Sequence, residues 1–312
     1  MTARRIAVTG ASGFIGRPLV RHLHACGREV TAVSRHAWPA PAGVRCVHVP
    51  AYSEHALHDA FAGADAVVHL AALAHRRNAP EADFASSVAA VDTAVRAAAL
   101  AGVRRFLFMS SIGVNGTLTH GRPFTEDTPP QPVEPYARSK VRAEQAVISG
   151  CSAAGMEYVI LRPPGVYGPH MRGNIGLLVK LVRKGVVLPF GAIRNARTMV
   201  GIDNLVDLVM RALDHPAAAN QLFLAGDGED LSTTQFIRHL GEGVGKPARL
   251  LPVPPSVLTL GATLIGHRRV ANGLCGDLQV DTSKVRRLLG WNPPLPPAEG
   301  VRRAAAAKEP HE

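Results

Sequence analysis

A glycine-rich stretch near the amino terminus constrains this chain more than any other feature. Residues 6–16 read Ile-Ala-Val-Thr-Gly-Ala-Ser-Gly-Phe-Ile-Gly, an apolar run followed by three glycines at a three-residue spacing. The run is typical of a buried parallel strand, and the glycine spacing is typical of a tight turn from that strand into a helix. Such a turn brings backbone N–H groups and the positive end of a helix dipole to a pyrophosphate. The stretch therefore predicts a dinucleotide site, although the same glycines standing alone would also fit a turn without a ligand.

Strand-like and helix-like segments alternate through the first half of the chain. Strands are expected at 30–33, 44–49, 66–70 and 105–109, and helices at 14–26, 54–61 and 84–101. This alternation predicts an α/β fold with a doubly wound parallel sheet, whose ligands bind at the carboxyl ends of the strands. Those ends read Thr9-Gly10, Ser34-Arg35, His69-Leu70-Ala71-Ala72, Ser110-Ser111 and Arg162-Pro163.

The charge of the chain is strongly positive but scattered. Lys and Arg outnumber Asp and Glu by 35 to 24, and the arginines often stand in doublets without forming a long basic run. We therefore expect a solvated basic surface, no nucleic-acid partner, and at most a weak peripheral contact with a membrane. The apolar stretch from Val257 to Ile265 is expected to be core or such a peripheral contact.

The cysteines and the amino terminus bear on the compartment. Cys26, Cys46, Cys151 and Cys275 lie far apart and form no metal-binding or redox pair, which favours reduced thiols. The first strand begins within a few residues of Met1, and no segment reaches the roughly 20 apolar residues that span a bilayer. We expect a cytoplasmic protein without a metal.

Ser34 and Arg35 bear on the choice of cofactor. A carboxylate about twenty residues beyond the glycine loop would accept hydrogen bonds from the ribose of NAD, whereas an arginine beside a hydroxyl can hold a 2′-phosphate. Neither residue is acidic, so NADP(H) is favoured and NAD(H) is the alternative; Arg35 could instead stack on adenine or face water. The glycine-loop residues expected to contact the cofactor are Gly10, Ser12, Gly13, Phe14, Ile15 and Gly16.

Reacting groups are expected at Ser111, Tyr136 and Lys140. A tyrosine and a lysine four residues apart lie on one face of a helix, so the ammonium can stabilise a phenolate and make the phenol a usable acid or base. Ser111 would donate a hydrogen bond to the same substrate oxygen. Standing alone, a Tyr and a Lys at this spacing would be a surface coincidence, but here they follow a dinucleotide motif.

Taken together, these motifs resemble the extended short-chain dehydrogenase/reductases of the nucleotide-sugar epimerase, dehydratase and reductase group. The resemblance rests on residues 9–16, 67–72, 106–111, 136–140, 161–169, 197–205 and 281–291. It implies a Rossmann-like nucleotide-binding domain over 1–165, with 196–225 returning to it, and a smaller, mainly C-terminal substrate-binding part over 166–195 and 226–303. It also implies a homodimer, and we expect residues 304–312 to be a disordered tail.

The resemblance extends the set of site residues. Leu70, Ala71, Ala72 and Pro163 are expected beside the cofactor, together with Tyr136 and Lys140. Arg197 matches an arginine that clasps nucleotide phosphates, and Asn174 matches an asparagine that contacts the substrate diphosphate. Asn174 could also serve only as a helix N-cap, and Arg197 could be a surface residue.

The chain also departs from the group's pattern. No acidic residue follows the third strand, where the sequence reads Val49-Pro50-Ala51-Tyr52, and Gly165 replaces a crossover asparagine. A second phosphate-binding arginine is absent from Leu274-Cys275, for which Arg268 or Arg269 could substitute. Sugar dehydratases of the group use an Asp-Glu pair to remove water; because Ile112 and Gly113 follow Ser111 instead, net dehydration is not expected.

Two reactions at sugar C4 stay open. A UDP-sugar 4-ketoreductase would use exchangeable NADPH, and a UDP-hexose 4-epimerase would use tightly held NAD. Arg35 favours the reductase, whereas residues 188–193 and 226–232 resemble bacterial surface-polysaccharide proteins often called UDP-glucose 4-epimerases. A catalytically silent dinucleotide-sensing scaffold of the same fold is the third alternative.

Overall fold

A seven-stranded parallel sheet forms the centre of the molecule. The computed structural model describes residues 2–71, 81–171, 173–264, 266 and 268–307. The sheet has the order β3-β2-β1-β4-β5-β6-β9, and every neighbouring pair is parallel. Its strands are β1 (Arg5–Thr9), β2 (Glu29–Ser34), β3 (Arg45–His48), β4 (Ala66–His69), β5 (Arg105–Met109), β6 (Glu157–Arg162) and β9 (Gln221–Leu224). The prediction of a doubly wound parallel sheet is confirmed.

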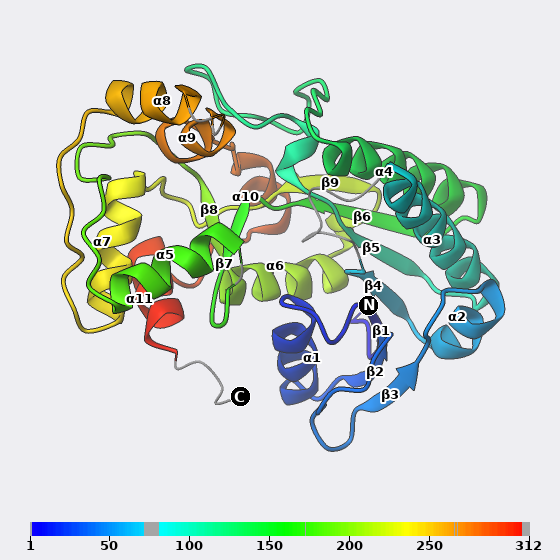
Figure 1. The fold of residues 1–312 in the computed structure, drawn as a ribbon. Coiled ribbons are helices and arrows are strands. Elements are labelled where there is room, and N and C mark those ends of the chain that lie inside the picture. Colours follow the sequence, from blue (N-terminus) through cyan, green and yellow to red (C-terminus); the bar gives the residue numbers. More distant parts are fainter. Residues whose placement is uncertain (1, 72–80, 172, 265, 267, 308–312) are drawn as a thin grey trace.

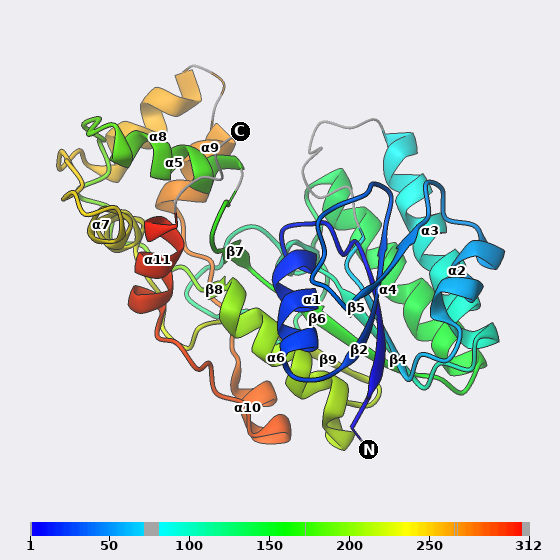
Figure 2. The ribbon, with the colours of Figure 1, turned by 90° about the horizontal axis from the view of Figure 1, so that it is seen from below.

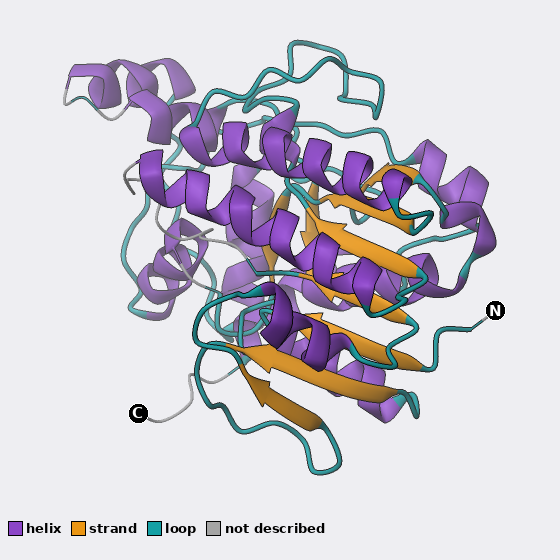
Figure 3. Cartoon of the chain, turned by 90° about the vertical axis from the view of Figure 1, so that its right-hand side faces the viewer, coloured by secondary structure: helices purple, strands orange, loops and turns teal. Residues whose placement is uncertain are grey.

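Helices cover both faces of this sheet (Figure 1 and Figure 3). One face carries α2 (Glu54–Phe61), α3 (Glu81–Leu100) and α4 (Pro135–Ala153), and the other carries α1 (Gly16–Ala25), α6 (Ile202–Asp214) and α10 (Ser283–Leu289). The short 3-10 helices are η1 (Ile112–Val114) and η2 (Pro216–Ala218). Most connections between the parallel strands thus run through helices, as the alternating sequence pattern predicts, whereas a loop without a helix joins β2 to β3.

The apolar strands are explained by burial on two sides. Ile6 and Val8 pack into one core cluster, while Ala7 between them packs into the cluster on the opposite face. In β5, Leu107 likewise packs into the first cluster and Phe106 into the cluster on the opposite face. A strand covered on both faces needs apolar residues at every position, so it shows a continuous run rather than an alternation.

A smaller lobe lies beside the carboxyl ends of the strands (Figure 2). It contains the two-stranded sheet of β7 (Gly165–Tyr167) and β8 (Met199–Gly201), with α5 (Gly173–Arg183), α7 (Thr233–Gly243), α8 (Pro255–Leu264), α9 (Arg268–Cys275) and α11 (Pro297–Ala306). Its core joins Tyr167, Phe236 and Val301, which are all buried. The domain boundaries expected from the sequence stay a prediction, but the expected disordered tail is wrong at its start, because α11 extends to Ala306 and buries Ala304 and Ala305.

β9 pairs with β6 and forms the edge of the parallel sheet, and the sequence did not predict this strand. Of the two expectations for the apolar stretch at 257–265, core is wrong for its described residues, because no residue of α8 is buried. In contrast, α2 and β5 have the predicted ends.

Candidate active site

The glycine loop closes so tightly that two of its positions exclude any side chain. Gly10 has a φ of 70°, and a Cβ there would lie 2.9 Å from the backbone nitrogen of Ala71, just beyond β4. A Cβ on Gly16 would lie 2.2 Å from the carbonyl oxygen of Gly10. The backbone of the loop therefore packs against the end of β4 and the start of α1, as a pyrophosphate cradle requires.

The start of α1 suits an anion. The helix begins at Gly16 after Ile15 at the N-cap, and its first turn holds no acidic residue. The first N–H groups of a helix have no partner within it, so they can donate to phosphate oxygens. The Nε of Arg17 donates to the carbonyl oxygen of Ser12 at 2.8 Å, which fixes a guanidinium beside the loop. The residues present therefore fit a dinucleotide pyrophosphate.

The predicted ribose-side residues lie at the end of β2. Ser34 is buried and its hydroxyl donates to the carbonyl oxygen of His36 at 2.7 Å, while Arg35 is exposed. The ring Nε2 of His48 donates to the carbonyl oxygen of Arg35 at 2.6 Å, which fixes the backbone that carries the guanidinium. The Ser34 oxygen can still accept a hydrogen bond, and Arg35 is accessible to a ligand.

Sequence reasoning missed a buried cluster behind the loop. Tyr52 hydrogen bonds to Thr9, and burial raises its pKa. The Nδ1 of His69 lies 3.0 Å from the hydroxyl of Thr9, and the Tyr52 and His69 rings meet edge to face with centroids 6.2 Å apart. Burial and the nearby Lys140 charge lower the pKa of His69 to about 3, so the imidazole is neutral. The only sequence signal was the missing acidic residue in the segment Val49-Pro50-Ala51-Tyr52. Through Thr9, the last residue of β1, the cluster contacts the strand that leads into the glycine loop.

Lys140 is a buried residue in the second turn of α4. Its Nζ donates to the carbonyl oxygen of Met109 at 2.7 Å and lies 5.8 Å from the ring centroid of Tyr136. Burial lowers the pKa of Lys140 to about 8, and the carboxylate of Glu144 one turn later opposes that effect. The ammonium thus lies on the same face of the helix as the phenol, as the four-residue spacing predicts.

Ser111 follows directly after β5. Its Oγ accepts a hydrogen bond from the backbone N–H of Gly113 at 3.2 Å and caps η1. Because the oxygen accepts there, the hydroxyl proton remains available to donate to another oxygen. The backbone of Pro163, another predicted site residue, accepts from the N–H of Ile112 at 3.0 Å, so the ends of β5 and β6 are held together.

A pocket brings several predicted residues into one hollow. Ala71 from the end of β4 lines it together with Tyr136 and Lys140. The remaining lining residues are Phe84, Ser87, Val88, Val91, Ser139 and Ala143. The ring centroids of Phe84 and Tyr136 are 6.5 Å apart, so α3 contributes an aromatic wall that sequence reasoning missed. Leu70 lies beside Ala71, whereas Ala72 lies outside the described residues.

A buried ion pair lies below the reacting groups. Arg162 at the end of β6 donates to both carboxylate oxygens of Glu144, at 2.9 and 2.6 Å. The hydroxyl of Ser110 donates to the same carboxylate, and the side-chain oxygen of Asn115 accepts from Arg162 at 3.0 Å. Every charge in this group has a partner, which buried charges need. The network joins β6 to β5 and α4, and the reacting groups follow β5 or lie in α4.

The predicted substrate residues belong to the smaller lobe. Arg197 precedes β8, and its guanidinium donates to the carbonyl oxygen of Gly276 at 2.9 Å. Burial lowers the pKa of Arg197. Asn174 is exposed in the first turn of α5. Contact of either residue with a substrate stays a prediction.

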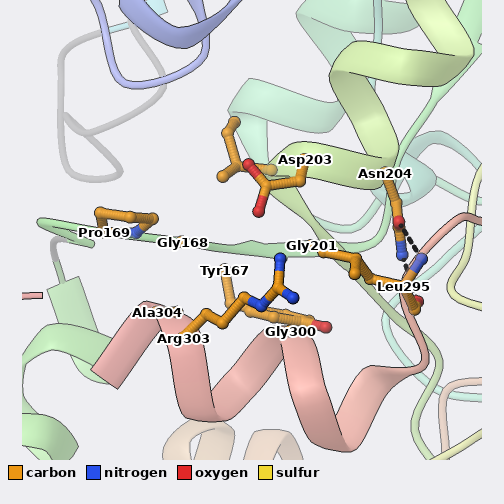
Figure 4. Close-up of a pocket in the computed structure, with 11 residues that line it drawn as sticks. Tyr167, Gly168, Pro169, Gly201, Asp203, Asn204, Leu295, Gly300, Arg303 and Ala304 are labelled. Carbon is orange, nitrogen blue, oxygen red and sulfur yellow. Dashed lines mark hydrogen bonds between the residues drawn. The ribbon is translucent and has the colours of Figure 1, made fainter. Parts of the chain in front are cut away.

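A second hollow lies at the joint between the two lobes (Figure 4). The hydroxyl of Tyr167 donates to Asp227 at 2.6 Å, and that carboxylate also accepts from the backbone N–H of Gly201 and from Asn204. Asn204 in turn pairs with the backbone of Leu295. Because these polar groups satisfy one another, we interpret the hollow as a structural joint.

Comparison with known proteins identifies the family. The model of the NAD dependent epimerase/dehydratase family matches residues 6–226. A UDP-glucose 4-epimerase of Vibrio cholerae is 38% identical, with 97% of this chain and 95% of the relative covered. An undecaprenol-linked N-acetylglucosaminyl-diphosphate 4-epimerase of Escherichia coli O157:H7 is 27% identical, with 90% and 88% covered.

Solved structures show the same fold. A UDP-glucose 4-epimerase of Thermotoga maritima has a TM-score of 0.79 at 24% identity, with 96% of this chain and 97% of that chain covered. A UDP-N-acetylglucosamine 4-epimerase of Bacillus cereus has a TM-score of 0.80 at 20% identity, with 97% and 98% covered. The prediction of an enzyme of this group is confirmed. The chain belongs to the NAD dependent epimerase/dehydratase family.

Proposed function

We propose that this enzyme acts at C4 of a UDP-sugar, and that it reduces a 4-keto sugar with NADPH. The observation that supports this most directly is the shared hollow of Ala71, Tyr136 and Lys140. In this hollow, Ala71 at the end of β4, beside the glycine loop, lies near the phenol of Tyr136, which would act as the acid, and the ammonium of Lys140. The 4-keto-6-deoxy-N-acetylhexosamines of surface-polysaccharide precursors are the substrates we would test first.

The chain's own residues have separate roles in this proposal. A bound nicotinamide would supply hydride to C4. Tyr136 would give its phenolic proton to the C4 oxygen, while the available proton of Ser111 would hold that oxygen in place. Lys140, held by the carbonyl of Met109, would contact the cofactor ribose and stabilise the phenolate left behind.

Substrate and cofactor would be held by charged and polar side chains from both lobes. Arg197 and Asn174 would bind the diphosphate of the UDP moiety, for which a guanidinium and a helix N-terminus are suited. Arg35, with Ser34, would bind the 2′-phosphate of NADP(H), and NAD(H) is the alternative cofactor. The enzyme would work as a homodimer.

A UDP-hexose 4-epimerase is the second candidate, because the Vibrio cholerae relative carries that name at 38% identity. In that reaction Tyr136 would first take the C4 hydroxyl proton and later return it. Incubation with UDP-N-acetylhexosamines and their 4-keto-6-deoxy derivatives, with and without NADPH, separates the two reactions. Stoichiometric use of NADPH indicates the reductase, and interconversion without net redox indicates the epimerase.

Removal of the Tyr136 hydroxyl tests both reactions. Tyr136→Phe should lower kcat by at least about 100-fold while dinucleotide affinity is retained, because a positioned acid contributes about 10²–10⁴ in rate. Tyr158→Phe is the matched control, since Tyr158 lies near the start of β6, at the amino end of the strand, whereas the reacting groups lie at the carboxyl ends. Equal activity of Tyr136→Phe and the parent would exclude Tyr136 from the mechanism. If neither protein turns over any UDP-sugar yet both bind a dinucleotide, the sensing scaffold is favoured.

Removal of the Arg35 charge tests the cofactor choice. Arg35→Ala should weaken NADPH about tenfold or more and NADH little, because a charge-assisted hydrogen bond contributes about 1.5–3 kcal/mol. Arg45→Ala, an exposed arginine at the start of β3, is the control. Titration of both cofactors into all three proteins measures this discrimination. An unchanged ratio of the two affinities in Arg35→Ala would contradict the NADP(H) assignment.

A further inference from the structure

Helix α8 turns its apolar side outward. Val257, Leu260 and Leu264 follow one another at the i, i+3, i+7 spacing of a single helix face, and they are 56%, 63% and 80% exposed. A surface helix of a globular protein ordinarily turns such a stripe toward the core. Here the stripe lacks a covering element among the described residues, and it needs an apolar environment from outside the chain.

The surroundings of α8 extend this surface. Leu251, just before the helix, and Val270 in α9, which packs against α8, are exposed as well. We call Leu251, Val257, Leu260, Leu264 and Val270 the α8 apolar face. Several large apolar side chains exposed on neighbouring segments mark an interaction surface rather than ordinary scatter.

The segment that carries the α8 apolar face has charges of one sign. Residues 246–276 contain no Asp or Glu, and they contain Lys246, Arg249, Arg268 and Arg269. Lys246 and Arg249 are exposed. A short apolar helix with cationic flanks and no carboxylates has the composition that enters the interface of an anionic bilayer.

A second copy of the chain fits this surface less well. Two identical faces meeting in a symmetric dimer would bring the cationic flanks of both copies together without any carboxylate from residues 246–276. The phosphates of anionic lipids have the complementary charge. We therefore propose that α8 and α9 form a docking surface for an anionic lipid bilayer.

The docked helix would lie in the plane of the membrane surface. At about 1.5 Å per residue, α8 is roughly 15 Å long, about half the hydrocarbon thickness of a bilayer. Within the described part of the chain, no helix has the length and apolar character needed to cross a membrane. Leu260 and Leu264 would enter the boundary between headgroups and acyl chains, while Lys246 and Arg249 remain among the phosphates.

Docking would orient the catalytic side of the enzyme. α8 and α9 lie on the same side of the molecule as the carboxyl ends of the parallel strands (Figure 2 and Figure 3). The glycine loop, Ser111 and the Tyr136 hollow are at those same ends. A membrane contact through α8 would thus bring the side that carries the candidate active site close to the lipid surface.

Sedimentation with vesicles tests the proposal. The full chain is mixed with vesicles of 30% phosphatidylglycerol in phosphatidylcholine, and separately with pure phosphatidylcholine vesicles. We expect stronger binding to the anionic vesicles and a loss of that binding as salt rises. No binding to anionic vesicles at low salt, or equal binding to both compositions, would overturn the proposal.

Two charge-bearing variants locate the surface. Leu260→Glu with Leu264→Glu should weaken vesicle binding by at least about tenfold, since burial of two leucines is lost. Leu100→Glu is the control: Leu100 is 65% exposed at the end of α3, a helix that packs against α2, α4 and β4 of the larger sheet and not against α8. Circular dichroism and the thermal midpoint establish that all variants fold. Equal loss in the control and the α8 variant would show that negative charge alone explains the effect and would overturn the assignment.

A basic-residue variant and the oligomeric state complete the test. Arg249→Glu should weaken binding to anionic vesicles about fivefold or more, because one basic residue near such a surface contributes about that factor. Sedimentation velocity of the parent and the α8 variant, without vesicles, reports on self-association. A parent dimer that the α8 variant disperses would show that a second copy covers the α8 apolar face, and would overturn the membrane assignment.

Discussion

The buried ammonium of Lys140 gives the sharpest test of the site's electrostatics. Lys140→Met keeps an unbranched side chain that is one heavy atom shorter, and it removes the charge. In the parent, burial lowers the pKa of Lys140 from its ordinary value of 10.5 to about 8. Because one pKa unit is worth about 1.4 kcal/mol, the charged form costs the folded state about 3 kcal/mol at neutral pH.

The sign of the pH dependence follows from proton binding. Below pH 8 both the folded and the unfolded chain hold the Lys140 proton, so the full cost is present. Between about pH 8 and 10.5 the folded chain has released the proton and the unfolded chain still holds it, so stability rises with pH. From pH 7 to pH 10, the free energy of unfolding of the parent should rise by about 2.5 kcal/mol relative to Lys140→Met.

Urea unfolding of both proteins at pH 7 and pH 10 measures this difference. Other groups that titrate at alkaline pH are common to both proteins, so their effects cancel between them. Lys140→Met also loses the hydrogen bond to the Met109 carbonyl. This loss lowers the free energy of unfolding equally at pH 7 and pH 10, so it cancels when the two pH values are compared. A relative stability that stays constant or falls by pH 10 would refute the argument, because the ammonium would then not be penalised by its surroundings.

Two further substitutions test the scaffold around the site. Glu144→Gln should lower the free energy of unfolding, measured with urea, by about 3–5 kcal/mol, because it leaves the buried guanidinium of Arg162 without its countercharge. Glu242→Gln, at an exposed carboxylate, is the control and should have little effect. An equal loss of stability in both variants would contradict the reasoning. Gly16→Ala should weaken dinucleotide binding at least about tenfold in a calorimetric titration, because its Cβ would meet the Gly10 carbonyl at 2.2 Å. Gly261→Ala, at a helical glycine with open space around it, is the control; it should leave dinucleotide binding unchanged and stabilise the fold by about 0.5–1 kcal/mol. Normal dinucleotide binding by Gly16→Ala would show that the loop backbone can shift to accept a Cβ.

Local patterns predicted most of the parallel sheet. β5 and α2 have the expected ends because an apolar run and a helical period are properties of consecutive residues. The Tyr136 and Lys140 pair was also accessible, since a spacing of four places two side chains on one face of a helix. Each of these predictions depended only on residues that are close together in the sequence.

Long-range partners could not be predicted in the same way. Glu144 and Arg162 are 18 residues apart, and their pairing depends on how α4 packs over β6. Tyr52 reaches Thr9 only because β1 lies beside β2, and β2 beside β3. The apolar residues of α8 are equally compatible with core and surface, because composition does not say which face a helix turns outward. Tertiary packing decides all three.

The position of β9 has a consequence for dividing the chain. This four-residue strand comes from beyond residue 220, yet it pairs with β6 and completes the edge of the nucleotide-binding sheet. A fragment that stops at residue 165 would leave the backbone donors and acceptors of Val159–Arg162 open to any other strand. Such a fragment should aggregate instead of folding as an independent module, so the nucleotide-binding sheet is complete only in a chain that extends at least to Leu224.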